Sequence, residues 1–368
     1  MDNKTIEQAQ MLSNRLQKRF RHLKKWAMRT GIDAFRLYDK DIPEIPLVLD
    51  FYGDCNLIYE AAVSGALYKR PYEKDERDEE LWLSAMKESI AEALGIPADR
   101  VFLKQRQRQR GVSQYEKMSG ARFEKIVSEG GLLSFKVNLS DYLDTGLFVD
   151  RRLLRAIIRD EAAGKKVLNL FSYTGSFSVY AAAGGAVSTD SVDLSNTYLN
   201  WARDNFSLNG FSAVISNKSH GDTGTRSCDS ITNTSLHKLI RADVLEFLQG
   251  AVLDKKKWDI IIADPPAFSN SKKMIGNFDL NRDLTRLLCQ CLELLASDGK
   301  IFLSVNLQRY APTAAGLEAE LNAQTQEQFG RLTAANVRVT DLGNKIVDED
   351  FKGRKMPKAF VIKFDTCS

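Results

Sequence analysis

The sequence contains few of the residues that build metal sites and disulfide frameworks. Its 368 residues include only three histidines, and its five cysteines are scattered without CxxC spacing. This composition argues against a disulfide scaffold, a closed zinc site or a histidine-rich metal centre. We therefore expect no bound metal, and unpaired thiols of this kind are typical of a reducing cytoplasm.

Long apolar runs are also missing. No stretch approaches the ~20 apolar residues that span a bilayer. The first sixteen residues, MDNKTIEQAQMLSNRL, have no apolar core followed by a small-residue cleavage site, so no export signal is visible. We expect a cytoplasmic protein without a membrane partner.

Charge of one sign is not in large excess, because 52 basic and 48 acidic residues leave a net charge of +4. That balance excludes a disordered polyelectrolyte, but it does not exclude a nucleic-acid partner, since local clustering matters more than the total. Two basic clusters are present. The first lies on a predicted amphipathic helix over 12–29, and the second is Lys104–Arg110. Each predicts either a phosphate contact or a solvated face.

The chain changes character near residues 145–165. Residues 1–145 predict a small α+β domain with strands over 35–38, 46–51 and 56–60, a helix over 79–94 and a hairpin over 123–137. From Lys165 onward, apolar strand patterns alternate with helical patterns, which predicts a mostly parallel sheet with helices on both faces. Residues 146–368 would form this second, Rossmann-like domain, and the polar stretch 216–235 predicts a flexible insertion.

Four features fall where strands of the predicted sheet end, which is where open α/β sheets bind ligands. The first is the glycine-containing turn Asn169–Ser176, and the second is Asp193, placed to accept ribose hydroxyls. The third is Asp243, which suits either an adenine amino group or a helix N-cap. The fourth is Asp264–Phe268, where two prolines hold an acid and an aromatic ring in one arrangement.

These features occur in the order typical of class I S-adenosylmethionine (SAM) methyltransferases, which the sequence resembles. The segments NLSDYLDTGLFVDRR, VLNLFSYTGSFSVYAAAGGA, STDSVDLSNTYLNWARDNFSLNG and ADPPAFSNSKKM are similar to the guanine-N7 half of the fused bacterial 23S rRNA guanine-N2/guanine-N7 methyltransferases. NRLQKRFRHLKKWA, RLYDKDIPE and QYEKM extend the likeness over nearly the whole chain. The guanine-N2 half and its RNA-binding module are absent, and residues 216–235 look inserted.

The resemblance implies SAM as cofactor and a set of cofactor-binding residues. They are Phe148, Asp150, Arg151, Asn169, Phe171, Ser172, Tyr173, Thr174, Gly175, Ser176, Asp193, Leu194, Ser195, Asp243, Val244 and Asp264. The residues expected at the reacting base are Asp264, Pro265, Pro266 and Phe268, with Phe268 as a stacking surface or as core packing.

The expected reaction is transfer of a methyl group to N7 of a guanosine in 23S rRNA. Guanine N7 already carries a lone pair, so alignment with the methyl carbon supplies most of the catalysis. Cytosine C5 chemistry needs a cysteine nucleophile, and Ser304–Arg309, the corresponding stretch here, has none. Methylation of another base or of a protein amine, and a SAM-binding ribosome assembly factor without turnover, remain alternatives.

The basic clusters predict the contacts with RNA. The residues assigned to this role are Arg15, Lys18, Arg19, Lys104, Arg106, Arg108, Arg110, Lys272 and Lys273. The expected partner is 23S rRNA, either naked or in an early large-subunit precursor, with a separate guanine-N2 methyltransferase as a further partner.

Overall fold

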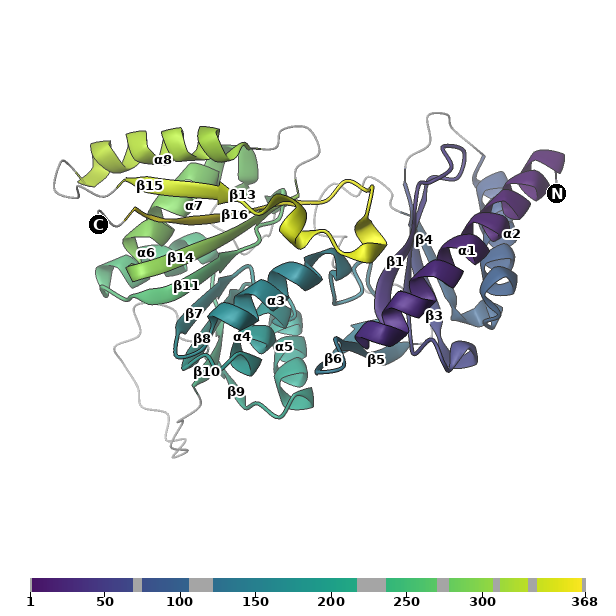
Figure 1. Ribbon diagram of the computed structural model, residues 1–368, viewed down its shortest axis with the longest axis horizontal. Coiled ribbons are helices and arrows are strands. Elements are labelled where there is room, and N and C mark those ends of the chain that lie inside the picture. The colour runs from purple at the N-terminus through teal and green to yellow at the C-terminus, as the bar shows by residue number, and fades with distance from the viewer. Residues whose placement is uncertain are drawn as a thin grey trace. The chain divides into compact units, whose positions relative to one another are not determined.

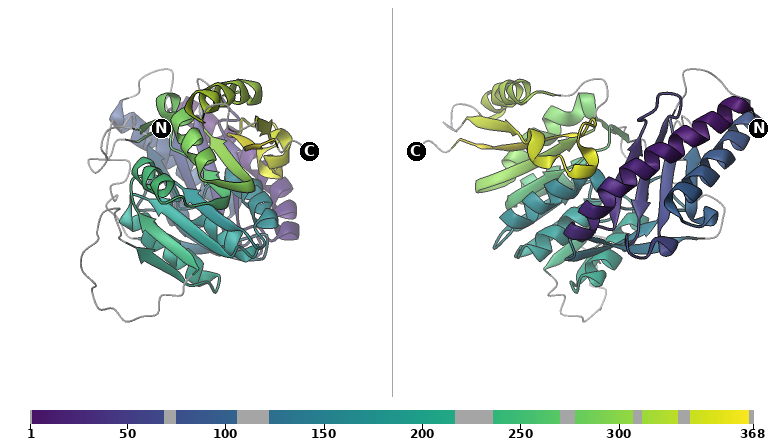
Figure 2. Two further views of the ribbon diagram at one scale, coloured as in Figure 1. Left: turned by 90° about the vertical axis from the view of Figure 1, so that its left-hand side faces the viewer. Right: turned by 45° about the vertical axis from the view of Figure 1, so that its right-hand side comes forward.

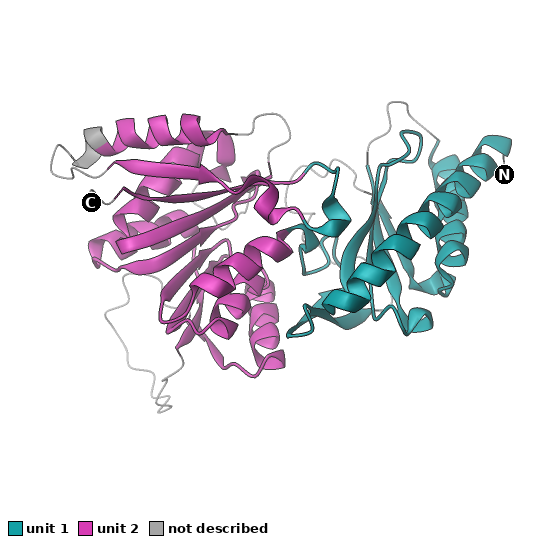
Figure 3. Ribbon diagram, viewed as in Figure 1, with its two compact units in different colours: residues 1–150, 348–355 teal, residues 151–347, 356–368 magenta. Residues whose placement is uncertain are grey.

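The structure is a computed structural model that forms two compact units (Figure 3). It describes residues 2–68, 75–105, 122–216, 236–269, 278–306, 312–329 and 336–365. Unit 1 comprises residues 1–150 and 348–355, and unit 2 comprises residues 151–347 and 356–368. The sequence placed the domain boundary at 145/146 and gave no sign that 348–355 belongs with the first unit.

Unit 1 is a helical layer packed on a four-stranded sheet (Figure 1). Its helices are α1 (Asn3–Thr30) and α2 (Glu76–Leu94), and its strands are β1 (Ala34–Asp39), β2 (Leu47–Tyr52), β3 (Ala62–Leu67) and β4 (Val101–Gln105). The first three strands pair antiparallel, and β4 pairs parallel with β3 after the α2 crossover. The predicted hairpin is confirmed as β5 (Glu124–Glu129) and β6 (Leu133–Asn138).

Helix α1 begins nine residues before the predicted start, because Asp2 caps it by accepting from the backbone N–H of Thr5. Leu12, Leu16 and Leu23 on its inner face are fully buried, as the amphipathic pattern predicted. The expected strand over 56–60 is wrong. The Asp54 side chain accepts from the Asn56 N–H at 2.7 Å, and this turn leads into a 3₁₀ helix, η1 (Ile58–Glu60).

Unit 2 holds an eight-stranded sheet of order β15-β16-β14-β11-β7-β8-β10-β9. Its strands are β7 (Lys166–Leu170), β8 (Ser188–Asp193), β9 (Ala213–Ser216), β10 (His237–Arg241), β11 (Trp258–Ala263), β14 (Leu295–Val305), β15 (Val337–Asp341) and β16 (Lys358–Phe364). Only β16 runs antiparallel to its neighbours β14 and β15, so the rest of the sheet confirms the predicted parallel arrangement.

Helices cover both faces of this sheet (Figure 2). They are α3 (Arg152–Glu161), α4 (Ser176–Ala183), α5 (Asn196–Leu208), α6 (Val244–Leu253), α7 (Leu280–Glu293) and α8 (Ala314–Phe329). Ile260 and Ile262 of β11 pack into the core with α3 and α4, whereas Ile261 packs into the core with α6 and α7. A strand buried on both faces explains the continuous apolar run in this part of the sequence.

No helix in the described ranges has the length and apolar character needed to cross a membrane. Residues 217–235, most of the predicted insertion, lie outside the described residues.

Candidate functional site

The register of the central strands brings three motifs to one edge of the unit 2 sheet. Leu170 pairs with Val192 of β8 on one side and with Ala263 of β11 on the other. The residues that follow these three, Phe171, Asp193 and Asp264, therefore lie at neighbouring carboxyl ends. Strand order reverses between β7 and β11, so this edge is the switch point where open α/β sheets bind ligands.

The turn after β7 has an unusual backbone. Phe171, Tyr173 and Gly175 all adopt positive φ, at 55°, 50° and 73°. Such conformations are costly for residues with a side chain, and they concentrate at ligand-binding turns. Between them lies Ser172, whose Oγ is buried and has no hydrogen-bond partner within the described ranges. The turn thus presents a polar atom that a bound ligand could satisfy.

Asp193 is tied to this turn. Its Oδ2 accepts from the Tyr173 N–H at 2.9 Å, and its Oδ1 accepts from the Ser195 N–H at 2.8 Å. Burial raises the pKa of Asp193 to about 6, and these backbone donors only partly offset the effect. The Leu194 N–H is a third backbone donor to this carboxylate, and of its about four lone-pair positions the remaining one suits a ribose hydroxyl.

Two predicted cofactor residues, Asn169 and Thr174, form hydrogen bonds that hold the turn in place. The Asn169 side chain, which is 1% exposed, donates to Ser178 Oγ at 2.9 Å, and Ser178 bonds Ser191 at 2.7 Å. The Thr174 carbonyl accepts from the Asn205 side chain at 2.9 Å. Ser178, Ser191 and Asn205 were missed from the sequence, although polar residues at positions predicted to face a core are a usable signal.

Asp243 caps α6, because its Oδ1 accepts from the N–H groups of Leu245 and Glu246. This is the N-cap alternative left open by the sequence, and contact with an adenine stays a prediction. Ser195 caps α5 through Tyr198, and Ser176 is the first residue of α4. Leu194 is half-buried and Val244 is buried beside these caps.

Asp264 follows β11 and forms an ion pair with Arg151. The Arg151 Nε lies 3.1 Å from Oδ2 and 3.3 Å from Oδ1, and Nη2 lies 3.0 Å from Oδ1. Pro265 is buried, Pro266 is half-buried, and Phe268 begins the short strand β12 (Phe268–Ser269) with 53% of its surface exposed. Exposure of Phe268 argues against the core-packing alternative and leaves the ring available for stacking.

Phe148 and Asp150 belong to unit 1, so their assignment to the cofactor stays a prediction. Phe148 is 42% exposed, and Asp150 lies in the short helix η4 (Val149–Arg151).

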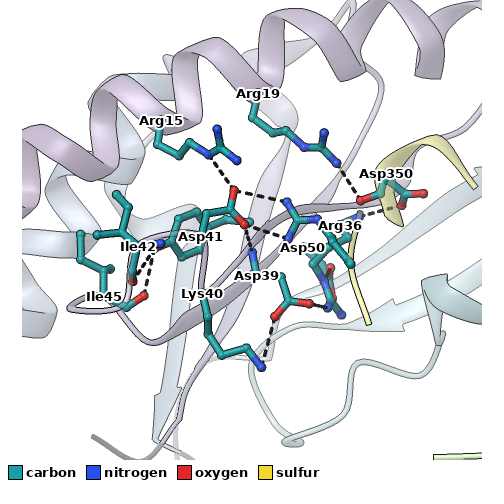
Figure 4. Close-up of polar contacts among 12 residues, drawn as sticks. Arg15, Arg19, Arg36, Asp39, Lys40, Asp41, Ile42, Ile45, Asp50 and Asp350 are labelled. Atoms are coloured by element: carbon teal, nitrogen blue, oxygen red, sulfur yellow. Dashed lines mark hydrogen bonds and ion pairs between the residues drawn. The ribbon is translucent and has the colours of Figure 1, made fainter. Parts of the chain in front are cut away.

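The predicted RNA contacts on α1 divide into occupied and exposed side chains. Arg15 bonds Asp41 at 2.7 Å, and Arg19 donates to the Asp350 carbonyl at 2.8 Å (Figure 4). Asp350 is fully buried, and its carboxylate accepts from the Arg36 N–H at 2.9 Å, which anchors the segment 348–355 in unit 1. Arg15 and Arg19 therefore have partners within unit 1, although the Arg15 side chain is 42% exposed, whereas Lys18 is exposed without such a partner among the described residues.

The second basic cluster is only partly described. Lys104 is 4% exposed and donates to the Tyr142 carbonyl. Burial lowers the pKa of Lys104 to about 8, so the structure does not support this residue as a phosphate contact. The other predicted contacts, Arg106, Arg108, Arg110, Lys272 and Lys273, lie outside the described residues.

Among the described residues, no group of three or more histidine, cysteine, aspartate or glutamate side chains is arranged to hold a metal ion.

Comparison with known proteins adds an independent line of evidence. The family model of S-adenosylmethionine-dependent methyltransferases matches residues 61–334. The chain is 40% identical over 351 residues to ribosomal RNA large subunit methyltransferase K of Neisseria meningitidis serogroup B, covering 95% of this chain and 86% of the relative. It is also 40% identical to methyltransferase K/L of Shewanella loihica, where the match covers 85% of this chain but only 40% of the relative.

A solved structure of a methyltransferase in complex with SAH shares 25% sequence identity, with a TM-score of 0.67 over 96% of this chain and 81% of the other. The site described above fits SAM: Asp193 offers an acceptor to the ribose, and the strained turn with the buried Ser172 Oγ lies beside it. This chain is an enzyme whose cofactor is SAM, and it belongs to the S-adenosylmethionine-dependent methyltransferase family.

Proposed function

We propose that this enzyme transfers the methyl group of SAM to N7 of a guanosine in 23S rRNA. The observation that carries the proposal is the 40% identity over 95% of the chain to a relative named ribosomal RNA large subunit methyltransferase K. The chain spans only 40% of the Shewanella K/L relative, so activities of the remainder of such fused proteins are not assigned to it.

The two described cysteines of unit 2 favour guanine N7 over cytosine C5 as the methylated atom. Cys289 and Cys291 are buried in α7, and burial raises the pKa of Cys289 to about 11 and that of Cys291 further. Thiols in such surroundings are inert rather than nucleophilic. In addition, Ser304, Val305 and Asn306 at the end of β14 include no cysteine.

The surroundings of Asp264 fit an orienting role, which is sufficient for methyl transfer to N7. An amine must lose a proton during methyl transfer, whereas N7 requires none. A carboxylate has about four lone-pair positions, and Arg151 already contacts both oxygens of Asp264. The remaining acceptor capacity suits a group that orients a base. Aligned nucleophile, methyl carbon and leaving sulfur then account for most of the rate.

The exposed face of α1 supplies a surface for RNA. Lys18, Arg21, Lys25 and Arg29 recur at three- and four-residue steps and are all exposed. We call these four residues the α1 basic stripe. None of them forms an ion pair or hydrogen bond with another described residue. Their spacing suits contacts with successive phosphates, together with the proposed contacts from Arg106, Arg108, Arg110, Lys272 and Lys273.

Two further points belong to the proposal. The substrate is naked 23S rRNA or an early precursor, because a guanosine in the interior of a mature particle could not reach the site. A separate guanine-N2 methyltransferase is the further partner that we propose. A 23S rRNA substrate also favours a cytoplasmic location for the enzyme.

The experiment is incubation of the purified protein with methyl-labelled SAM and deproteinised large-subunit rRNA, followed by nucleoside mass analysis. We expect N7-methylguanosine as the single labelled product. The variant D193A serves as the control that lacks cofactor affinity. A product of 5-methylcytidine or N2-methylguanosine, or no product at all, would overturn the assignment.

A further inference from the structure

The ion pair between Arg151 and Asp264 is unusually well defined for two side chains 113 residues apart. The Arg151 side chain is 9% exposed and that of Asp264 is 16% exposed, so both are largely removed from water. Nε reaches both carboxylate oxygens, whereas Nη2 reaches only Oδ1. Arg151 immediately precedes α3, and Asp264 immediately follows β11, so two rigid elements of unit 2 support the contact.

A planar guanidinium bound to a planar carboxylate fixes the orientation of the carboxylate as well as its distance. The two parallel N–H groups of the guanidinium restrict rotation of the carboxylate about its Cβ–Cγ bond, whereas a lysine ammonium would leave this rotation free. The shorter contacts pair Nε with Oδ2 at 3.1 Å and Nη2 with Oδ1 at 3.0 Å, so each carboxylate oxygen keeps about one acceptor position, as recognition of two adjacent donors requires. The orientation of the acceptor that Asp264 presents is therefore set by Arg151.

The chemistry of guanine decides which edge such an acceptor can meet. N7 and O6 are both hydrogen-bond acceptors, so a carboxylate placed against them is repelled. The opposite edge carries the donors N1–H and N2–H₂. An acid that contacts this edge leaves N7 on the far side of the ring, open to the methyl group. Adenine presents an acceptor at N1 and is disfavoured by the same carboxylate.

We propose that Arg151 is a positioning residue, which orients the Asp264 carboxylate so that it recognises the N1–H and N2–H₂ donors of the target guanine. This inference rests on the proposed function, and it gives Arg151 a role different from the cofactor contact that the resemblance implied. Arg151 acts through Asp264 and does not itself touch the base.

The test compares Arg151→Lys and Arg151→Met with the wild-type enzyme on an RNA fragment that contains the methylated guanosine. A second fragment carries inosine there, which keeps N7 and N1–H but lacks the N2 amine. The matched control is Arg159→Met, because Arg159 lies on α3, the helix that begins directly after Arg151, and bonds its neighbour Asp160 through Nε and Nη2. SAM affinity is measured by calorimetry, and methyl transfer is measured under single-turnover conditions.

For the wild type, we expect inosine to reduce methyl transfer about tenfold, the low end for loss of a base-edge contact. Both Arg151 variants should lose about 10²-fold in rate on guanosine, as for a misplaced catalytic contact. Their SAM affinity should not change, and the ratio between guanosine and inosine should fall toward one. Arg159→Met should resemble the wild type throughout.

Three results would overturn the inference while leaving the proposed function intact. They are a parallel loss of SAM affinity, an unchanged guanosine-to-inosine ratio in Arg151→Met, and wild-type behaviour of Arg151→Lys. If the Arg151 variants do not fold, Asp264→Asn replaces them. In this variant the amide oxygen would accept from Arg151, so the NH₂ group would face the guanine donors. A guanosine-to-inosine ratio equal to that of the wild type would then reject the inference. A wild-type enzyme that produced no N7-methylguanosine would reject the proposed function itself.

Discussion

The backbone N–H of Tyr173 donates to Asp193 Oδ2 over 2.9 Å, and this hydrogen bond joins the strained turn after β7 to the end of β8. The acid that would hold the ribose also stabilises the turn that would hold the rest of the cofactor. Binding of SAM and the geometry of the turn should therefore change together.

The first prediction concerns pH. Burial raises the pKa of Asp193 to about 6, and a ribose hydroxyl donates to its ionised form. SAM affinity should therefore rise between pH 5 and pH 7, and at pH 5 it should be about tenfold weaker because only about a tenth of the carboxyl is ionised. Calorimetric titrations at several pH values measure this change.

The raised pKa of Asp193 also predicts that the free energy of unfolding changes with pH in the direction opposite to SAM affinity. Between the ordinary value of 3.8 and about 6, the folded protein binds more protons at Asp193 than the unfolded chain does. The contribution of Asp193 to the free energy of unfolding should thus be greatest below this range and should fall as pH rises through it. The variant D193N should lose both dependences, and a D193N enzyme that kept them would show that another group titrates.

The second prediction concerns Gly175. Its φ is +73°, and a Cβ there would lie 2.8 Å from Ala202 Cβ on α5. Gly175→Ala should reduce the free energy of unfolding by more than the ~1–2 kcal/mol expected from left-handed backbone alone. It should also weaken SAM binding, because the turn must move.

Gly210 provides a matched control. Its φ is +78°, but a Cβ there meets nothing within 4 Å. Gly210→Ala should reduce the free energy of unfolding only by the amount expected from left-handed backbone, and this variant should bind SAM normally. Equal destabilisation and equal SAM affinity of the two variants, measured by denaturant melts and calorimetry, would show that the contact with Ala202 has no role.

The third prediction concerns the α1 basic stripe. Replacement of Lys18, Arg21, Lys25 and Arg29 by glutamine should weaken RNA binding and reduce its salt dependence. Each lost phosphate contact should lower the slope of log K against log salt concentration by about 0.7–0.9. The thermal midpoint should barely change, since all four side chains are exposed.

Binding assays at several salt concentrations measure this slope. The exposed pair Lys255 and Lys256, which follows α6 in unit 2, supplies the control, and its replacement by glutamine should leave the slope unchanged. An unchanged slope for the α1 variant would exclude this helix face from the RNA interface.

The fourth prediction concerns Phe268. Stacking on a base contributes ~1–3 kcal/mol per base in single-strand recognition, so Phe268→Ala should weaken RNA binding or raise KM accordingly. Because the ring is 53% exposed, thermal stability should change little. Phe268→Leu keeps an apolar side chain without an aromatic face, and wild-type activity of that variant would rule out stacking.

Local patterns in the sequence were sufficient for much of the architecture. The alternation of apolar strands with helices after Lys165 predicted the parallel sheet, and the Gly130-Gly131 turn predicted the β5–β6 hairpin. These features depend on neighbours a few residues apart, which the sequence displays directly. The prediction of a strand over 56–60 was wrong because the Asp54 side chain accepts a hydrogen bond from the Asn56 N–H. Strand propensity does not take such a local side-chain hydrogen bond into account.

The sequence by itself determined which motifs end which strands, because strand periodicity and turn residues are local signals. Only the tertiary structure decided what each charged side chain contacts. Arg19 meets the carbonyl of Asp350, 331 residues away, and Arg151 meets Asp264, 113 residues away. Lys104, which the sequence placed in a basic cluster, is buried and donates to the Tyr142 carbonyl. Burial and pairing between distant segments depend on how the chain packs, and composition carries no record of that packing.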